Sequence, residues 1–250
     1  MASTVYMFHS IGKLSSSDSA DIHYNYSNDK FIDFLKCVGP ATSIVKAKEM
    51  NNISSPVLTF DDGHLSNYDA ALSLVEKNLG YGDFFVNPAM VGKKDFMSWA
   101  QLRELSRLGM SIQSHSYEHI YLSDYAKKDQ LYQLKRSKLE IEDKIGVGVL
   151  ILAPPGGRYN KVTEKVAKEL GYQSIAISKP GVWKKKDQYL IPRIPVMVHD
   201  SVMKLSECSE PRSKSMRNLQ KKYYITGLAK KSLGNKVYEK IRERIIGGDQ

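Results

Sequence analysis

The chain contains the stretch Pro56-Val57-Leu58-Thr59-Phe60-Asp61-Asp62-Gly63, an apolar run that ends in two adjacent carboxylates and a glycine. Such a run is typical of a buried strand, and Asp-Asp-Gly marks its carboxyl end. The segment Met110 to Ser114 shows the same pattern and leads into His115 and His119. Either motif alone fits an ordinary turn or a surface loop. Together they predict carboxylates and imidazoles at one edge of a parallel sheet.

Short apolar runs alternate with segments of helical periodicity along the first 200 residues. We expect strands at 4–8, 56–60, 83–86, 110–114, 147–152, 174–177 and 191–196, and helices at 31–38, 71–78, 98–108, 129–145 and 161–170. This alternation indicates an α/β fold in which helices cover a largely parallel sheet. The segment 200–215 is rich in Ser, Glu and Lys and is expected to be a loop.

Composition indicates a soluble globular protein, with 42% apolar and 26% charged residues in 250. The longest apolar stretch, Val147 to Ala153, is too short to span a bilayer. The opening Met1 to Val5 lacks the features of a secretory signal, so we expect a cytoplasmic protein. Cys37 and Cys208 have no metal-binding pattern nearby and are expected to be free thiols.

The positive charge is concentrated at the carboxyl end. From Glu210 to Gln250 there are eleven Lys or Arg against four acidic residues, a net +7 of the chain's +10. We therefore predict two regions, a catalytic domain at 1–205 and a basic helical extension at 206–250. An apolar stripe in the extension fits either a helix on an anionic membrane or one packed on the domain; it comprises Leu233, Val237, Ile241 and Ile245. No nucleic-acid recognition module accompanies the charge, so nucleic acid is the least favoured partner.

The two motifs together provide the groups of a hydrolytic metal site. One carboxylate and two neutral imidazoles are ordinary ligands of Zn²⁺ and its first-row neighbours, and three protein ligands leave a position open for water. A second carboxylate that stays off the metal can take a proton from that water.

These residues resemble a known family. Thr59 to Gly63 and His115 to His119 match the first two motifs of the polysaccharide deacetylases, carbohydrate esterase family 4 with its NodB homology domain, and the resemblance covers roughly residues 4–200. It implies a deformed (β/α) barrel that hydrolyses N-acetyl groups of sugars. By the resemblance Asp61 is the general base, and one divalent metal is bound, Zn²⁺ before Co²⁺, Ni²⁺ or Fe²⁺. Its ligands would be Asp62, His115 and His119.

The third family motif departs from the pattern. It usually opens with Arg, but here the equivalent segment is Ala153-Pro154-Pro155-Gly156-Gly157. The remaining residues are expected to shape a substrate groove: Pro154, Pro155 and Gly156. Arg158 or Arg193 could supply the missing cation beside Asp61. Arg193 is favoured because it lies in an apolar strand, where an unpaired charge would be costly.

A general acid and a sugar-stacking aromatic are the remaining expectations. The family closes with Leu-x-His, to which Val198-His199 is a partial match. His9, within Tyr6 to Ile11, resembles the opening segment of a circularly permuted branch and is favoured as the acid. Trp183, in a loop, is the expected platform for a sugar ring.

The predicted function is metal-dependent hydrolysis of N-acetyl groups on an acetamido sugar, with release of acetate. We expect an N-acetylated glycan, or a lipid-linked or nucleotide-linked sugar of surface-polysaccharide synthesis, and a basic tail at the inner membrane face. Two alternatives stay open: a deacetylase-fold carbohydrate-binding protein without turnover, which the missing Arg would explain, and a hydrolase of another acyl group.

Overall fold

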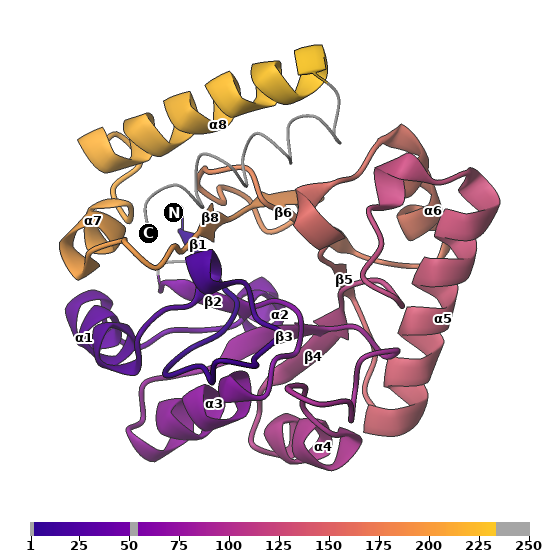
Figure 1. Ribbon diagram of the computed structural model, residues 1–250, viewed down its shortest axis with the longest axis horizontal. Helices are drawn as coiled ribbons and strands as arrows, with labels where there is room; N and C mark the ends of the chain where they lie inside the picture. Colours follow the sequence, from indigo (N-terminus) through magenta and orange to yellow (C-terminus); the bar gives the residue numbers. More distant parts are fainter. Residues whose placement is uncertain (1–2, 51–54, 234–250) are drawn as a thin grey trace.

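The structure, a computed structural model, describes residues 3–50 and 55–233 (Figure 1). Eight strands form one parallel sheet in the order β7-β6-β5-β4-β3-β2-β1-β8. Their bounds are β1 Val5–Phe8, β2 Val57–Phe60, β3 Gly82–Val86, β4 Ser111–Ser114, β5 Ile151–Leu152, β6 Ser174–Ile177, β7 Leu190–Pro192 and β8 Ile194–Pro195. The expected parallel α/β sheet is confirmed.

The two edges of this sheet are joined by a single stretch of chain. β7 pairs with β6 and β8 pairs with β1, yet only Arg193 separates β7 from β8. The amide of Arg193 donates to Ile177 of β6, whereas that of Val196 donates to Met7 of β1. The predicted strand 191–196 is therefore present but broken at Arg193, and it closes the sheet into a deformed barrel.

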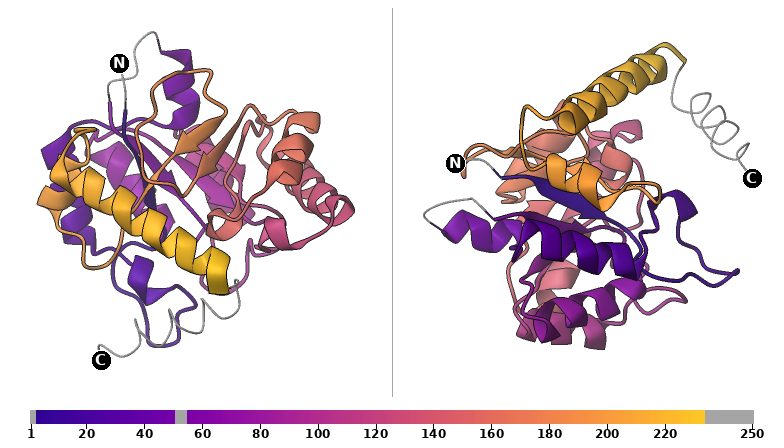
Figure 2. Two further views of the ribbon diagram at one scale, coloured as in Figure 1. Left: turned by 90° about the horizontal axis from the view of Figure 1, so that it is seen from above. Right: turned by 90° about the vertical axis from the view of Figure 1, so that its left-hand side faces the viewer.

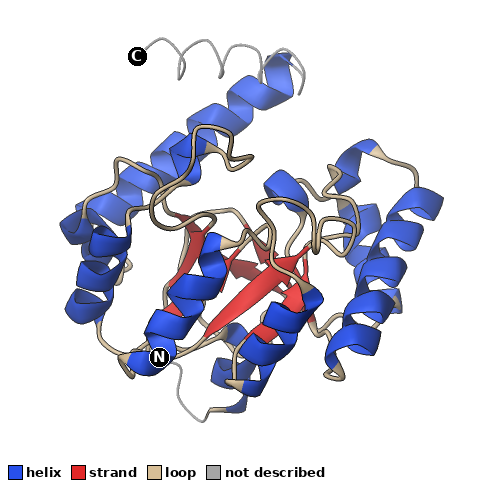
Figure 3. Cartoon of the chain, turned by 60° about the horizontal axis from the view of Figure 1, so that its bottom comes forward, coloured by secondary structure: helices blue, strands red, loops and turns tan. Residues whose placement is uncertain are grey.

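Helices surround the strands (Figure 3). The helices are α1 Asn28–Val38, α2 Ile44–Glu49, α3 Ser66–Glu76, α4 Trp99–Arg107, α5 Lys127–Ile145, α6 Lys161–Glu169, α7 Val202–Glu207 and α8 Lys214–Leu233, with 3-10 turns η1 Ile22–Tyr24, η2 Leu122–Asp124 and η3 Pro155–Gly157. Ser98, the first residue of the helix expected at 98–108, caps α4 through a reciprocal capping box with Gln101. Among the described helices, none is long and apolar enough to cross a bilayer.

Alternating strand residues build two cores, an outer core between the strands and the helices and an inner core inside the barrel. Phe8, Phe60 and Phe84 point outward and stack in series beneath the helices, with ring centroids 5.7 and 4.6 Å apart. Val57 and Phe85 point into the barrel, where they pack with residues of α2. Because side chains alternate along a strand, this inward set fixes which residues enter the site beyond the strand ends.

Two local predictions are wrong, and one helix was missed. The segment 200–215 is not a loop throughout, because Ser201 caps α7, whose Leu205 is buried in the outer core. Its polar composition concealed a one-sided helix. The strand predicted at 147–152 is reduced to β5, which covers only its last two residues. Helix α2 was not predicted, although Ser43 accepts a hydrogen bond from the amide of Lys46 as its cap.

Helix α8 leaves the barrel beside α7 and runs along one side of the molecule (Figures 1 and 2). Met216 is fully buried and Leu219 packs against the outer core, so the start of α8 is docked. Carbonyls on both sides of the predicted boundary after residue 205 accept hydrogen bonds from the start of the chain: the hydroxyl of Tyr6 donates to Leu205, and that of Thr4 donates to Cys208. The boundary at 205 stays a prediction, and Val237, Ile241 and Ile245 lie outside the described residues.

Candidate active site

Three polar side chains enter the barrel at the carboxyl ends of their strands. His9, Asp61 and His115 directly follow β1, β2 and β4. The amide of Asp61 donates to Phe8 and that of His115 to Val86, each at 2.9 Å, so the parallel ladder continues to these positions. The sheet therefore places the three residues at the same end of the barrel, as the two sequence motifs predict for Asp61 and His115.

Asp62, His115 and His119 form a compact cluster of potential metal ligands. The Oδ1 atom of Asp62 lies 3.1 Å from Nε2 of each histidine, and the three ligand atoms are within 4.8 Å of one another. This Oδ1 is buried and lacks a hydrogen bond of normal geometry within the described chain. Burial raises the pKa of Asp62, but contact with His115 and His119 outweighs it and holds that pKa well below its usual value. An ionised oxygen and two imidazole nitrogens suit a divalent first-row metal.

The cluster has a strained backbone. Asp62, Ser116 and His119 adopt positive φ angles of 70°, 68° and 59°, a region that non-glycine residues rarely occupy. Gly63, also at positive φ, lies so close to Val86 that an added Cβ would be 3.1 Å from its side chain. Such strain persists only where surrounding contacts fix the chain.

His115 is oriented by the third-motif segment. Its Nδ1 lies 2.7 Å from the carbonyl oxygen of Ala153, which can only accept, so Nδ1 carries the proton. Nε2 is then the nitrogen left to bind a metal, and it lies 3.1 Å from Oδ1 of Asp62. A histidine ligand held in this way is common in metal sites. Ala153 thus contributes through its backbone, at the position where the family pattern has Arg.

Asp61 is bound by a buried guanidinium. Arg193 is fully buried and donates from both terminal nitrogens to the two carboxylate oxygens of Asp61, at 2.6 and 2.8 Å. It also donates to the hydroxyl of Thr59 and lies 5.2 Å from the ring centre of Phe85. Burial raises the pKa of Asp61, but Arg193 more than offsets it and keeps the carboxylate ionised. Arg158, the other candidate, instead lies 4.2 Å above the ring of Tyr121.

His9 faces the same cluster. It is half-buried, its ring centroid is 4.5 Å from that of Tyr24, and its Nδ1 lacks a hydrogen-bond partner among the described residues. Burial lowers the pKa of His9, against the opposing fields of Asp62 and Asp61. His199 is exposed beyond β8, and within the described chain it makes no hydrogen bond or ion pair with these side chains. Tyr24 was not predicted, because no local pattern distinguishes it.

Comparison with known proteins identifies the family. The family model for polysaccharide deacetylase matches residues 48–175, which include both motifs and just over half of the chain. The chain belongs to the polysaccharide deacetylase family. This confirms the resemblance seen in the sequence.

Individual relatives agree with this family. YxkH of Bacillus subtilis, described as a candidate polysaccharide deacetylase, is 26% identical over 77% of this chain and 70% of its own. The peptidoglycan-N-acetylglucosamine deacetylase of Bacillus cereus is 28% identical over 54% of this chain and 61% of its own. The deacetylase PplD of Streptococcus pyogenes, solved with acetate, has the same fold, with a TM-score of 0.75 and 23% identity over 84% of this chain and 99% of its own.

The third-motif segment forms a tight turn. Pro154 and Pro155 are buried, while Gly156 is exposed and has a φ of 60°. A Cβ on Gly156 would come within 2.7 Å of the ring of Tyr121. Tyr121, which was not singled out from the sequence, thus packs against the turn. The proposed role of this segment as a substrate groove stays a prediction.

The prediction for Trp183 is wrong. Trp183 is fully buried in the inner core, and its Nε1 donates to the carbonyl of Lys185 at 2.6 Å. Its backbone pairs with Ser3, which precedes β1 and so lies at the end of the barrel opposite the cluster. A side chain enclosed there has no face on which a sugar could stack.

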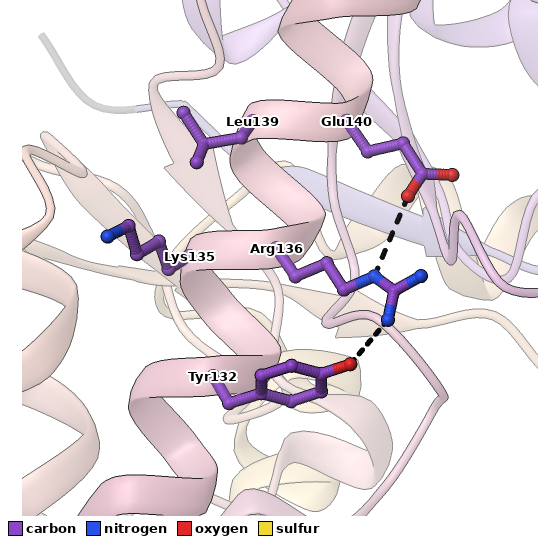
Figure 4. Close-up of a pocket in the computed structure, with 5 residues that line it drawn as sticks. All are labelled: Tyr132, Lys135, Arg136, Leu139 and Glu140. Carbon is purple, nitrogen blue, oxygen red and sulfur yellow. Dashed lines mark hydrogen bonds and ion pairs between the residues drawn. The ribbon is translucent and has the colours of Figure 1, made fainter.

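A separate hollow lies on exposed residues of α5 (Figure 4). Its volume is about 410 Å³, and it is lined by Tyr132, Lys135, Arg136, Leu139 and Glu140. Arg136 contacts both Tyr132 and Glu140, so its charge is already engaged. None of the potential metal ligands lines this hollow, and the catalytic groups therefore lie elsewhere.

Proposed function

We propose that the protein is a metal-dependent N-deacetylase of an acetamido sugar. The observation that carries the proposal is the pairing of two units: a ligand cluster of one carboxylate and two imidazoles, and beside it an ionised carboxylate held by Arg193. Asp62, His115 and His119 would hold the metal, of which Zn²⁺ best matches these ligands. A carboxylate outside the ligand set is the group that a hydrolase needs as a base.

The residues have distinct roles in amide hydrolysis. A bound divalent metal lowers the pKa of water and polarises the substrate carbonyl. Asp61 accepts a proton from the attacking water, and its low pKa keeps it ionised for that task. His9 donates a proton to the departing nitrogen as the C–N bond breaks. Water and the acetamide are thereby converted to acetate and a free amine.

The acyl group and the sugar are argued from relatives. The Bacillus cereus relative is named for N-acetylglucosamine, and the streptococcal structure contains acetate. We therefore place an N-acetylated glycan first among substrates. A lipid-linked or nucleotide-linked precursor of a surface polysaccharide is the finer form of this proposal.

The exposed side of α8 supports a peripheral membrane contact. Lys221 and Lys222 are exposed beside Tyr224 and Ile225, whose exposed fractions are 68% and 65%. Cations with adjacent aromatic and aliphatic side chains suit an anionic bilayer surface. We propose the inner face of the cell membrane as the location, because that leaflet carries negative charge. Replacing both lysines by Glu should abolish co-sedimentation with anionic vesicles but leave turnover of a soluble acetylated sugar unchanged.

Metal content and acetate release test the proposed function together. The purified wild type should hold about one equivalent of metal, Asp62→Ala should lose it, and Asp61→Asn should retain it while losing acetate release. A wild type that stays without metal after incubation with Zn²⁺, Co²⁺, Ni²⁺ or Fe²⁺ would exclude this function. Metal binding with release of an acid other than acetate would favour the other-acyl alternative.

The binding-protein alternative has lost its support in the structure. It rested on the absence of Arg at position 153. Arg193, at the junction of β7 and β8, binds Asp61 and would provide the cation that the motif lacks.

A further inference from the structure

We propose that Gln133 of α5 is a positioning residue that fixes the loop His115 to His119 and thereby sets the affinity for the metal. This inference rests on the proposed function, since it concerns the same metal. It is suggested by a difference in how the two histidines of the cluster are held.

The ring of His115 is fixed directly, but the ring of His119 is not. His115 donates from Nδ1 to Ala153 and its side chain is only 2% exposed. His119 has a side chain that is 43% exposed, and within the described chain its only recorded polar contact is with Asp62. The position of its Nε2 therefore depends on the backbone that carries it.

That backbone is held from two sides. The side-chain amide of Asn87 donates to the carbonyls of His115 and Ser116, at the start of the loop. Gln133 holds the next part: its Oε1 accepts from the hydroxyl of Ser116 at 3.2 Å and from the amide of Glu118 at 2.9 Å. Its Nε2 donates to the carboxylate of Glu118 at 2.6 Å.

Gln133 is placed to counter strain in this loop. Ser116 and His119 both have positive φ. The two hydrogen bonds that Oε1 of Gln133 accepts come from Ser116 itself and from the residue just before His119. Gln133 is 4% exposed, so little water is available to replace these bonds. Without it, the loop can relax toward ordinary backbone angles, and Nε2 of His119 then leaves its place beside Asp62.

The matched control is Gln130, one turn earlier on the same helix. Gln130 is also buried and makes two hydrogen bonds, to the carbonyl of Tyr125 and from the hydroxyl of Thr163. Its loss should therefore destabilise the fold in a similar way without touching the histidine loop. If Gln133→Ala weakens metal binding and Gln130→Ala does not, the effect is specific to the loop.

The experiment is a Zn²⁺ titration of the full chain against a competing chelator, with thermal unfolding of the metal-free protein alongside. We expect Gln133→Ala to weaken Zn²⁺ binding about 10- to 100-fold, the usual effect of losing a residue that orients a ligand. Gln130→Ala should bind Zn²⁺ like the wild type although its unfolding temperature falls. Equal Zn²⁺ affinity in Gln133→Ala and the wild type, or an equal loss in Gln130→Ala, would overturn the inference.

A charge exchange keeps the test decisive if Gln133→Ala does not fold. Gln133→Glu alone places a carboxylate against Glu118 and should weaken Zn²⁺ binding. Adding Glu118→Gln restores a donor for that carboxylate and should return most of the affinity. A double variant no better than the single one would refute the role of Gln133, whereas a wild type without any metal would refute the proposed function itself.

Discussion

The guanidinium of Arg193 binds both carboxylate oxygens of Asp61, from a position 132 residues further along the chain. The two residues lie on segments that are not neighbours in the sheet order, since β2 is separated from β8 by β1. The contact therefore passes across the inside of the barrel. This contact keeps the carboxyl group of Asp61 ionised although the third motif of this chain lacks the usual Arg.

Arg193→Leu should impair both stability and catalysis. Leaving Asp61 buried without its partner should destabilise the fold by about 3–5 kcal/mol. In the folded fraction kcat should fall about 100-fold, and the acidic limb of the rate profile should move to higher pH, because the pKa of Asp61 rises without Arg193. Urea unfolding and acetate release at several pH values measure the two effects. Arg158→Ala is the comparison, and an equal upward shift of the acidic limb there would contradict the assignment.

The two candidate acids are separable by matched substitutions. His9→Gln should lower kcat by about 100-fold or more, since a lost general acid typically costs that much. His199→Gln, on an exposed residue, should stay close to the wild-type rate. Both variants should keep their metal, which the same titration verifies. The reverse ranking of the two rates would transfer the role to His199.

Asp83 makes stability depend on pH near neutrality. It is fully buried in β3, where burial raises its pKa to about 7 although the amides of Ile44 and Val45 donate to it. Its folded-state pKa exceeds the unfolded value of 3.8, so its contribution is complete below pH 3.8 and is lost as pH rises through about 7.

Asp83→Asn should flatten this dependence. In the wild type the loss should approach about 1.4 kcal/mol per pH unit between pH 5 and 7, and the variant should lack that slope. Urea unfolding at pH 5, 6, 7 and 8 measures it. The exposed Asp33, paired with Lys36 on α1, provides the control substitution. A steep slope retained in Asp83→Asn would show that another group is responsible.

Gly156 should resist replacement more than Gly171, which also has a positive φ. Gly156→Ala brings Cβ against Tyr121, whereas Gly171→Ala, at a φ of 82°, meets no atom within 4 Å. Both should lose about 1–2 kcal/mol from backbone strain. Only Gly156→Ala should lose a further 1–3 kcal/mol or so from overpacking, together with a higher KM if the turn borders the groove. Thermal unfolding and KM measured side by side test this, and equal losses would remove the steric explanation.

The metal cluster was predictable because its signals are local. Asp61 and Asp62 come at the end of one strand and His115 at the end of another, and the chain between His115 and His119 is short. Side chains alternate along a strand, and the carboxyl ends of parallel strands lie at the same end of the sheet, so these residues are expected to lie close together. Arg193 could be favoured on the cost of an unpaired charge in an apolar strand, and its position on Asp61 agrees with that reasoning.

Residues defined by distant neighbours were not predictable. Gln133 lies on the buried face of α5 together with Leu134 and Ile141, but its amide side chain gave no sign in the sequence that it would be buried there. The contacts of Tyr24 and Tyr121 could not be predicted, because only the fold brings their partners from other parts of the chain next to them. An aromatic residue in a loop can line a cleft or close the inner core, and Trp183 does the latter. Helix α7 was missed because its apolar residues are too few to dominate a polar composition.

The break in the strand at Arg193 links closure of the barrel to the arrival of a cation beside Asp61. The same few residues that join β6 to β1 also deliver the cation that Asp61 requires. During synthesis, the ribosome releases this segment after Asp61, Asp62 and both histidines have emerged. A partly made chain can therefore carry every metal ligand while its base still lacks a counterion. If Asp61 is the base as proposed, catalysis would begin only when the barrel has closed and Arg193 has reached this carboxylate.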